Sequence, residues 1–111
     1  MKRQAVFFIL PPRTLLLDVA GPAEALTMAN RYQREVRFEL HYAGPSPQIK
    51  SSIGLTLSGI SALPESPARN AMIVVSGAAS APEDPDLPTA RSAIVEWLRR
   101  IARPTHRLVF I

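Results

Sequence analysis

Along this chain, short runs that are apolar throughout, or apolar at every second position, alternate with segments of helical periodicity. This order restricts the fold more than any other feature of the sequence. A short apolar run bounded by proline or glycine is typical of a buried strand, because a core helix needs more residues. The expected strands are residues 5–10, 37–43, 72–75 and 108–111, and the expected helices are residues 22–30 and 89–102. Alternation in the second strand places Phe38, Leu40 and Tyr42 on one face. The second helix has an apolar stripe of Ala90, Ile94, Trp97, Leu98 and Ile101. Strands that alternate with helices favour an α/β fold with a parallel sheet.

Proline and glycine mark the connections between these elements. The Gly21-Pro22 pair suits the first turns of a helix, where the missing proline donor has no partner to lose. Gly54 lies between two short segments that suit a β-hairpin outside the main sheet. The hairpin segments are residues 48–51 and 55–60, and the expected loops are residues 62–70 and 80–87.

The expected strand order brings two turns together. If the strands at 37–43 and 72–75 flank the first strand, the two helices cover opposite faces and the winding reverses between them. Open α/β sheets bind ligands at such a reversal, at the carboxyl ends of the strands. We therefore expect the turn with Asp18 to meet the turn with Ser76 and Gly77.

Asp18, Glu24 and Gly77 each have a functional and a structural interpretation. Asp18 suits an acid or hydrogen-bonding partner at the sheet edge, but the pattern alone favours an N-cap that accepts from the amide of Ala20 or Gly21. Glu24 is expected as a first-turn carboxylate favoured by the helix dipole rather than as a catalytic residue. Gly77 either lets backbone amides approach a ligand or is a plain turn glycine.

Other candidates for chemistry are weak. The sequence has no cysteine, which excludes disulfides, thiolate metal ligands and a thiol nucleophile within these 111 residues. His41 and His106 lack metal-ligand neighbours in the sequence and are expected at the surface. Serines have no base at motif spacing, so a serine nucleophile is not expected. We expect no metal, no cofactor and no catalytic residue.

The charge and the hydropathy pattern restrict partners and location. The net charge is +4, but the arginines are spaced as at helix ends and solvated faces, so direct nucleic-acid binding by this segment is not the preferred interpretation. The first apolar run is too short for a secretory signal, and nothing is typical of a membrane span. We expect a cytoplasmic protein that does not contact a membrane.

Several motifs resemble the DJ-1/PfpI superfamily. They are Val6-Phe-Phe-Ile-Leu, Leu17-Asp18-Val-Ala-Gly21-Pro22-Ala-Glu24, Tyr42-Ala-Gly44, Ser51-Ser52-Ile-Gly54-Leu55, Ile73-Val-Val-Ser76-Gly77 and Arg107-Leu-Val-Phe-Ile111. Within the superfamily they are most similar to the sensor domains that precede an AraC-type helix-turn-helix in GlxA-like transcriptional regulators. The Leu-Asp-x-x-Gly-Pro-x-Glu turn is the most specific of these motifs.

The resemblance implies a flavodoxin-like, doubly wound parallel sheet and a small-molecule pocket. In the family's enzymes an acidic residue at the position of Asp18 contacts a cysteine that directly follows the strand matched by residues 107–111, where this sequence ends. The family commonly has two glycines where this chain has Gly77 and Ala78, which puts the oxyanion geometry in question. The candidate pocket residues are Asp18, Gly21, Glu24, Ser76, Gly77 and Ala78.

Residues 1–111 are thus expected to be part of a DJ-1/PfpI-like domain that is incomplete at its C-terminus. The preferred function is sensing of an unknown small-molecule effector and homodimerisation in an AraC-family regulator, with DNA bound only by a C-terminal domain outside this chain. A fragment of a hydratase or amidase-like enzyme and a stand-alone interaction module are the alternatives. The apolar residues 108–111 are expected as a buried strand whose free edge promotes self-association.

Overall fold

Four parallel strands form the central sheet, in the order β2-β1-β5-β6. The structure, a computed structural model, describes residues 1–79, 84–104 and 106–111. The strands are β1 (Lys2–Ile9), β2 (Val36–Ala43), β5 (Met72–Val75) and β6 (Arg107–Phe110). β1 lies between β2 and β5, so the winding reverses next to β1 as the sequence predicted.

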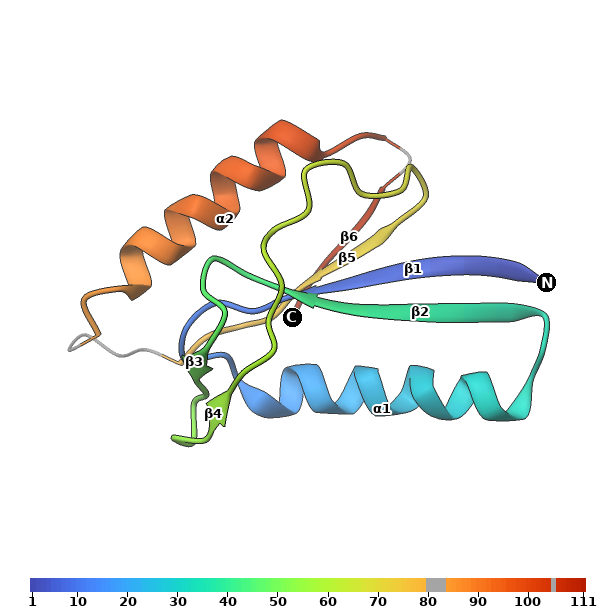
Figure 1. Cartoon of the computed structure of the whole chain (residues 1–111), viewed down its shortest axis with the longest axis horizontal. Helices are drawn as coiled ribbons and strands as arrows, with labels where there is room; N and C mark the ends of the chain where they lie inside the picture. Colours follow the sequence, from blue (N-terminus) through green and yellow to red (C-terminus); the bar gives the residue numbers. More distant parts are fainter. Residues whose placement is uncertain (80–83, 105) are drawn as a thin grey trace.

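One helix covers each face of this sheet (Figure 1). Helix α1 (Leu16–Tyr32) packs with Val6 and Phe8 of β1 in one apolar cluster. Helix α2 (Leu87–Ile101) places Ile94 and Trp97 in a second cluster on the opposite face. The molecule is therefore a flavodoxin-like α/β sandwich, and the expected fold class is confirmed.

Helix α2 follows its sequence pattern closely. It begins two residues before the expected start, with Pro88 in its first turn, where a missing amide donor has no cost. The apolar stripe predicted for this helix faces the sheet, and Trp97 is almost fully buried. The Trp97 indole Nε1 donates to the carbonyl of Pro64 at 2.7 Å, which satisfies its only polar group.

Helix α1 begins earlier than the sequence indicated. Its first residue is Leu16, so Gly21 and Pro22 lie inside the helix rather than in its first turns. Pro22 has no amide hydrogen, and the carbonyl of Asp18 consequently has no helical partner four residues on. The expected start was wrong because Gly21-Pro22 was interpreted as the point where the helix begins.

A two-stranded hairpin projects from the sheet beside α1 (Figure 1). It consists of β3 (Ile49–Lys50) and β4 (Thr56–Leu57), which pair antiparallel as expected. The amide of Ser52 donates to the carbonyl of Thr14 at 2.8 Å, which fixes the hairpin to the segment before α1. This contact places β4 opposite the first turns of the helix.

The last strand differs from its expectation. β6 pairs with β5 at one edge of the sheet, and its side chains are exposed rather than buried. Phe110 is 65% exposed, and Leu108, Val109 and Ile111 are each more than a third exposed. The prediction of a buried strand was therefore wrong for this chain, whereas the expected free apolar edge is present.

Residues 80–83 of the expected loop over 80–87 lie outside the described residues. Among the residues that are described, no helix combines the length and the hydropathy needed to cross a lipid bilayer.

Candidate functional site

Asp18 and Gly77 meet at the carboxyl edge of the sheet, as the expected strand order required. The amide of Leu15 donates to the carbonyl of Gly77 at 2.9 Å, and the amide of Ala79 donates to the carbonyl of Arg13. A Cβ atom at Gly77 would lie 3.0 Å from Oδ2 of Asp18 and 2.9 Å from the carbonyl oxygen of Ile111. Segments after β1, β5 and β6 therefore converge on one point, which we call the carboxyl-edge cluster.

Asp18 is not the N-cap of α1. Leu15 occupies that position and supplies no side-chain hydrogen bond, while Asp18 lies in the first turn. The expected capping of Ala20 or Gly21 was wrong, because the helix begins before Asp18. The half-buried Asp18 carboxylate accepts no hydrogen bond from the described residues, and the helix dipole favours its negative charge there.

The turn after β5 contributes backbone groups to the same cluster. The hydroxyl of buried Ser76 donates to the carbonyl of Gly77 at 3.0 Å, so this side chain is already engaged. Within the part of the chain that is described, the amides of Gly77 and Ala78 donate to no acceptor. An acceptor-only carboxylate thus lies near two unused backbone donors, a combination that suits a ligand carrying both a donor and an acceptor.

Gly21 and Glu24 do not join this cluster. Gly21 is exposed on α1, and a Cβ atom there would meet nothing within 4 Å. Glu24 lies two turns beyond the start of α1 rather than in its first turn, so the expected dipole interaction is lost. Glu24 instead borders a separate pocket.

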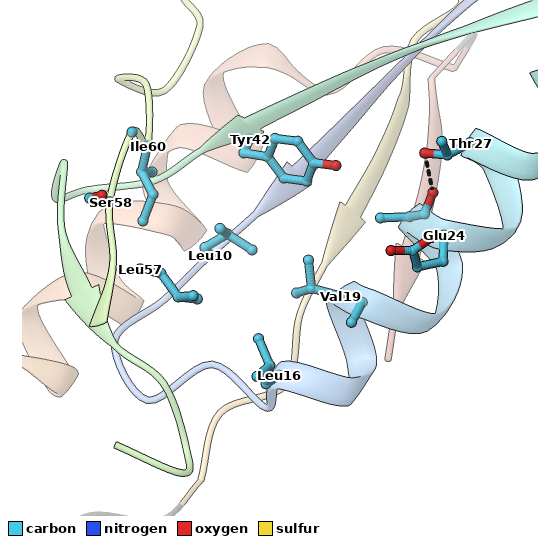
Figure 2. Close-up of a pocket in the computed structure, with 12 residues that line it drawn as sticks. Leu10, Leu16, Val19, Glu24, Thr27, Tyr42, Leu57, Ser58 and Ile60 are labelled. Carbon is cyan, nitrogen blue, oxygen red and sulfur yellow. Dashed lines mark hydrogen bonds between the residues drawn. The ribbon is translucent and has the colours of Figure 1, made fainter. Parts of the chain in front are cut away.

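That pocket lies between α1, the end of β2 and the segment that follows β4 (Figure 2). Its volume is about 370 Å³, within the size range of small-molecule sites. The walls are mostly apolar side chains, and Glu24, Thr27, Tyr42 and Ser58 supply polar groups. We call it the α1 pocket.

The sequence indicated only part of the α1 pocket. Alternation along the second strand placed Tyr42 on the same face as Phe38 and Leu40. Phe38 and Leu40 pack against the apolar cluster that α1 forms with β1. Nothing in the local pattern showed that Leu57 and Ser58 would return to that face. Their position depends on how the hairpin docks, which is a tertiary contact between distant segments.

Both histidines contact other residues of this chain. His41 stacks on Phe7 with ring centroids 4.6 Å apart. Nδ1 of His106 accepts from the amide of Arg103, so Nε2 carries the proton and donates to the carbonyl of Ala68 at 3.0 Å. In the described ranges, no group of three or more His, Asp and Glu side chains could hold a metal ion.

Comparison with known proteins adds a sequence relative. No protein-family model matches the chain. The uncharacterized protein in the cpoL 5′ region of Streptomyces lividans is 34% identical over 89 residues, which cover 78% of this chain and 62% of that protein. The chain therefore spans less than two thirds of this relative's length.

Two solved structures share the architecture. A candidate transcriptional regulator protein from Vibrio parahaemolyticus superposes with a TM-score of 0.73 and 14% identity, over 98% of this chain and 56% of that one. An AraC family transcriptional regulator from Pseudomonas putida gives a TM-score of 0.54 and 15% identity, over 96% of this chain and 80% of that one. At these identities the likeness shows the fold, so the resemblance to the DJ-1/PfpI superfamily stays a prediction. The chain has an α/β fold that is found in transcriptional regulators.

Proposed function

We propose that this chain is the effector-sensing part of an AraC-family transcriptional regulator. The observation that carries the proposal is the superposition of 98% of the chain on a candidate regulator. The second structural neighbour, an AraC family regulator, agrees with the same assignment. The chain spans 56% of the first neighbour and 80% of the second, so both neighbours have residues beyond the matched part. In this proposal a C-terminal domain outside these 111 residues binds the DNA.

The effector contacts the carboxyl-edge cluster in this proposal. The free carboxylate of Asp18 accepts a hydrogen bond from the ligand, and the unused amides of Gly77 and Ala78 donate to it. A small polar molecule with adjacent donor and acceptor groups, such as a carboxamide, has the matching chemistry. The resemblance places the thiol of the enzymatic alternative directly after residue 111, so the lack of cysteine in these residues does not decide between the two functions. Both structural neighbours are described as transcriptional regulators, which favours the sensor.

The position of the cluster also offers a route to regulation. Asp18 belongs to α1, Gly77 follows β5 and Ile111 follows β6, and both Asp18 and Ile111 approach Gly77 closely. A ligand that contacts Asp18 and Gly77 changes the packing where these elements meet. We propose that the change reaches a homodimer interface and a DNA-binding domain in a cytoplasmic regulator.

Thermal denaturation with pools of small polar molecules tests the proposal. We expect at least one pool that contains amino acids or carboxamides to raise the melting temperature, because a ligand that binds only the folded state stabilises it. Asp18→Asn should abolish that increase, and Asp86→Asn at the start of α2 is the matched control that should retain it. No stabilising pool, or equal stabilisation of the Asp18→Asn variant, would contradict the proposed site.

A further inference from the structure

The α1 pocket is separate from the carboxyl-edge cluster and has its own chemistry. Its apolar wall comes from distant segments, including Leu10 after β1, Val19 of α1, Leu57 of β4 and Ile60 beyond it. Leu10, Val19 and Ile60 are each less than a tenth exposed, so they form a fixed floor. A mostly apolar, preformed pocket with few polar groups is the usual form of a small-molecule site.

Glu24 gives the pocket a negative charge without a compensating cation. The residues three and four positions away on the helix are Ala20, Gly21, Thr27 and Met28, none of which is basic. Across the described ranges, the Glu24 carboxylate takes part in no ion pair or hydrogen bond. The chain has a net charge of +4, so the Glu24 carboxylate gives the pocket a charge opposite in sign to the net charge of the molecule.

The other polar groups of the pocket add hydrogen-bond acceptors. The hydroxyl of Thr27 donates to the carbonyl of Ala23 at 2.8 Å, so its remaining capacity toward a ligand is that of an acceptor. Tyr42 reaches from β2 toward α1, and Figure 2 shows its hydroxyl on the same side of the pocket as Glu24 and Thr27. The apolar residues Leu10 and Leu57 lie on the other side in that view.

From this arrangement we infer that the α1 pocket binds a small organic cation, namely an apolar body that carries a protonated amine. The apolar body covers Leu10, Val19 and Leu57, and the ammonium group donates to Glu24 and to the facing hydroxyls. An ammonium has three donors and no acceptor, which matches a set of acceptors around one carboxylate. An anion of the same size is repelled by Glu24.

Hexylammonium, hexan-1-ol and hexanoate are the probes that separate charge from hydrophobicity. The three probes have the same alkyl chain and differ in the charge of the head group. Isothermal titration calorimetry of each probe with the 111-residue chain therefore compares only the head groups. Because Glu24 is exposed, we expect hexylammonium to bind at most about fivefold more tightly than hexan-1-ol, which is the upper end for one exposed ion pair. Hexanoate should bind more weakly than both.

Variants assign the effect to the pocket. Glu24→Gln should reduce the affinity for hexylammonium by the same factor and leave that for hexan-1-ol unchanged, whereas Leu57→Ser should weaken both. Glu96→Gln removes a helical carboxylate on α2 that is also exposed, and it should change neither affinity. Asp18→Asn should also have no effect, so this result is independent of the proposed effector site.

Three results would overturn the inference. They are equal affinity for hexylammonium and hexanoate, no change in hexylammonium affinity in Glu24→Gln, and no saturable binding of hexylammonium. Sedimentation velocity in the same samples identifies the competing occupant, a second copy of the chain. If hexylammonium dissociates a dimer that Glu24→Gln also dissociates, the pocket is a protein interface and the inference fails.

Discussion

Asp18 and Gly77 lie together because the strands that precede them are neighbours in the sheet. Their proximity could be predicted from the sequence, since parallel strands end at one edge and the Met72 strand was expected beside the first strand. The position of Asp18 in the first turn of α1, rather than at its N-cap, could not be predicted, because it depends on where α1 begins. Glu24 was chosen from its motif alone, and the fold places it in a different pocket.

Gly77→Ala tests the close packing of the carboxyl-edge cluster. The added methyl group would lie 2.9 Å from the carbonyl oxygen of Ile111 and 3.0 Å from Oδ2 of Asp18, so one of them must move. We expect the free energy of unfolding to fall by about 1–3 kcal/mol, as in other overpacked positions. Urea denaturation monitored by the fluorescence of Trp97 measures it.

Gly21→Ala is the matched control for that substitution. Position 21 is exposed inside α1 and has open space around the new methyl group. Alanine is a better helix former than glycine, so we expect stabilisation of about 0.5–1 kcal/mol. Equal effects of the two substitutions would show that Gly77 is not closely packed.

Helices α1 and α2 show how far local pattern determines an element. The stripe of α2 has clear helical spacing, and the structure places Ile94, Trp97 and Ile101 in the core as predicted. The start of α1 was predicted too late, because the rule that places proline in a first turn was applied to Pro22. Packing of Val19 and Ala23 against the sheet overrides the local cost of that proline.

Pro22→Ala should stabilise α1. The substitution restores an amide that can donate to the carbonyl of Asp18, and alanine is about 3 kcal/mol more favourable than proline inside a helix. Part of this gain is lost because proline also restricts the unfolded chain. We expect a net increase of about 2 kcal/mol in the free energy of unfolding, measured by urea denaturation.

The result for Pro88→Ala provides the comparison. Pro88 lies in the first turn of α2, where no helical hydrogen bond is missing. We expect a change within about 0.5 kcal/mol there. A Pro22→Ala variant no more stable than the parent would mean that Pro22 is not inside a regular helix.

At the scale of the whole molecule, the alternation of strands and helices predicted a parallel sheet, and the assumed positions of the strands at 37–43 and 72–75 on either side of the first strand agree with the structure. The two helices on opposite faces followed from those positions (Figure 1). The position of β6 beside β5 was not predicted. The exposure of β6 could not be read from residues 108–111, because an apolar run gives no information about which elements lie over it. The α1 pocket could not be predicted for a related reason, because part of its wall forms only when the hairpin packs beside α1.

The exposed edge strand predicts self-association of this chain. β6 has one unpaired edge among the described strands, and its large apolar side chains are exposed, which together favour pairing with another chain. Phe110→Lys should shift the sedimentation profile toward monomer. Leu17→Lys changes an 81% exposed leucine on α1 and should leave the profile unchanged; equal effects would contradict a role for β6.

Backbone amide chemical shifts of the ¹⁵N-labelled chain, recorded during titration with each stabilising compound from the thermal screen, test the sensor proposal most directly. If the chain senses its effector at the carboxyl edge, the amides of Gly77 and Ala78 will shift saturably, and Asp18→Asn will remove those shifts. Saturable shifts confined to other parts of the chain would contradict the proposed site. The absence of any saturable shift would contradict the assignment of this chain as a sensor.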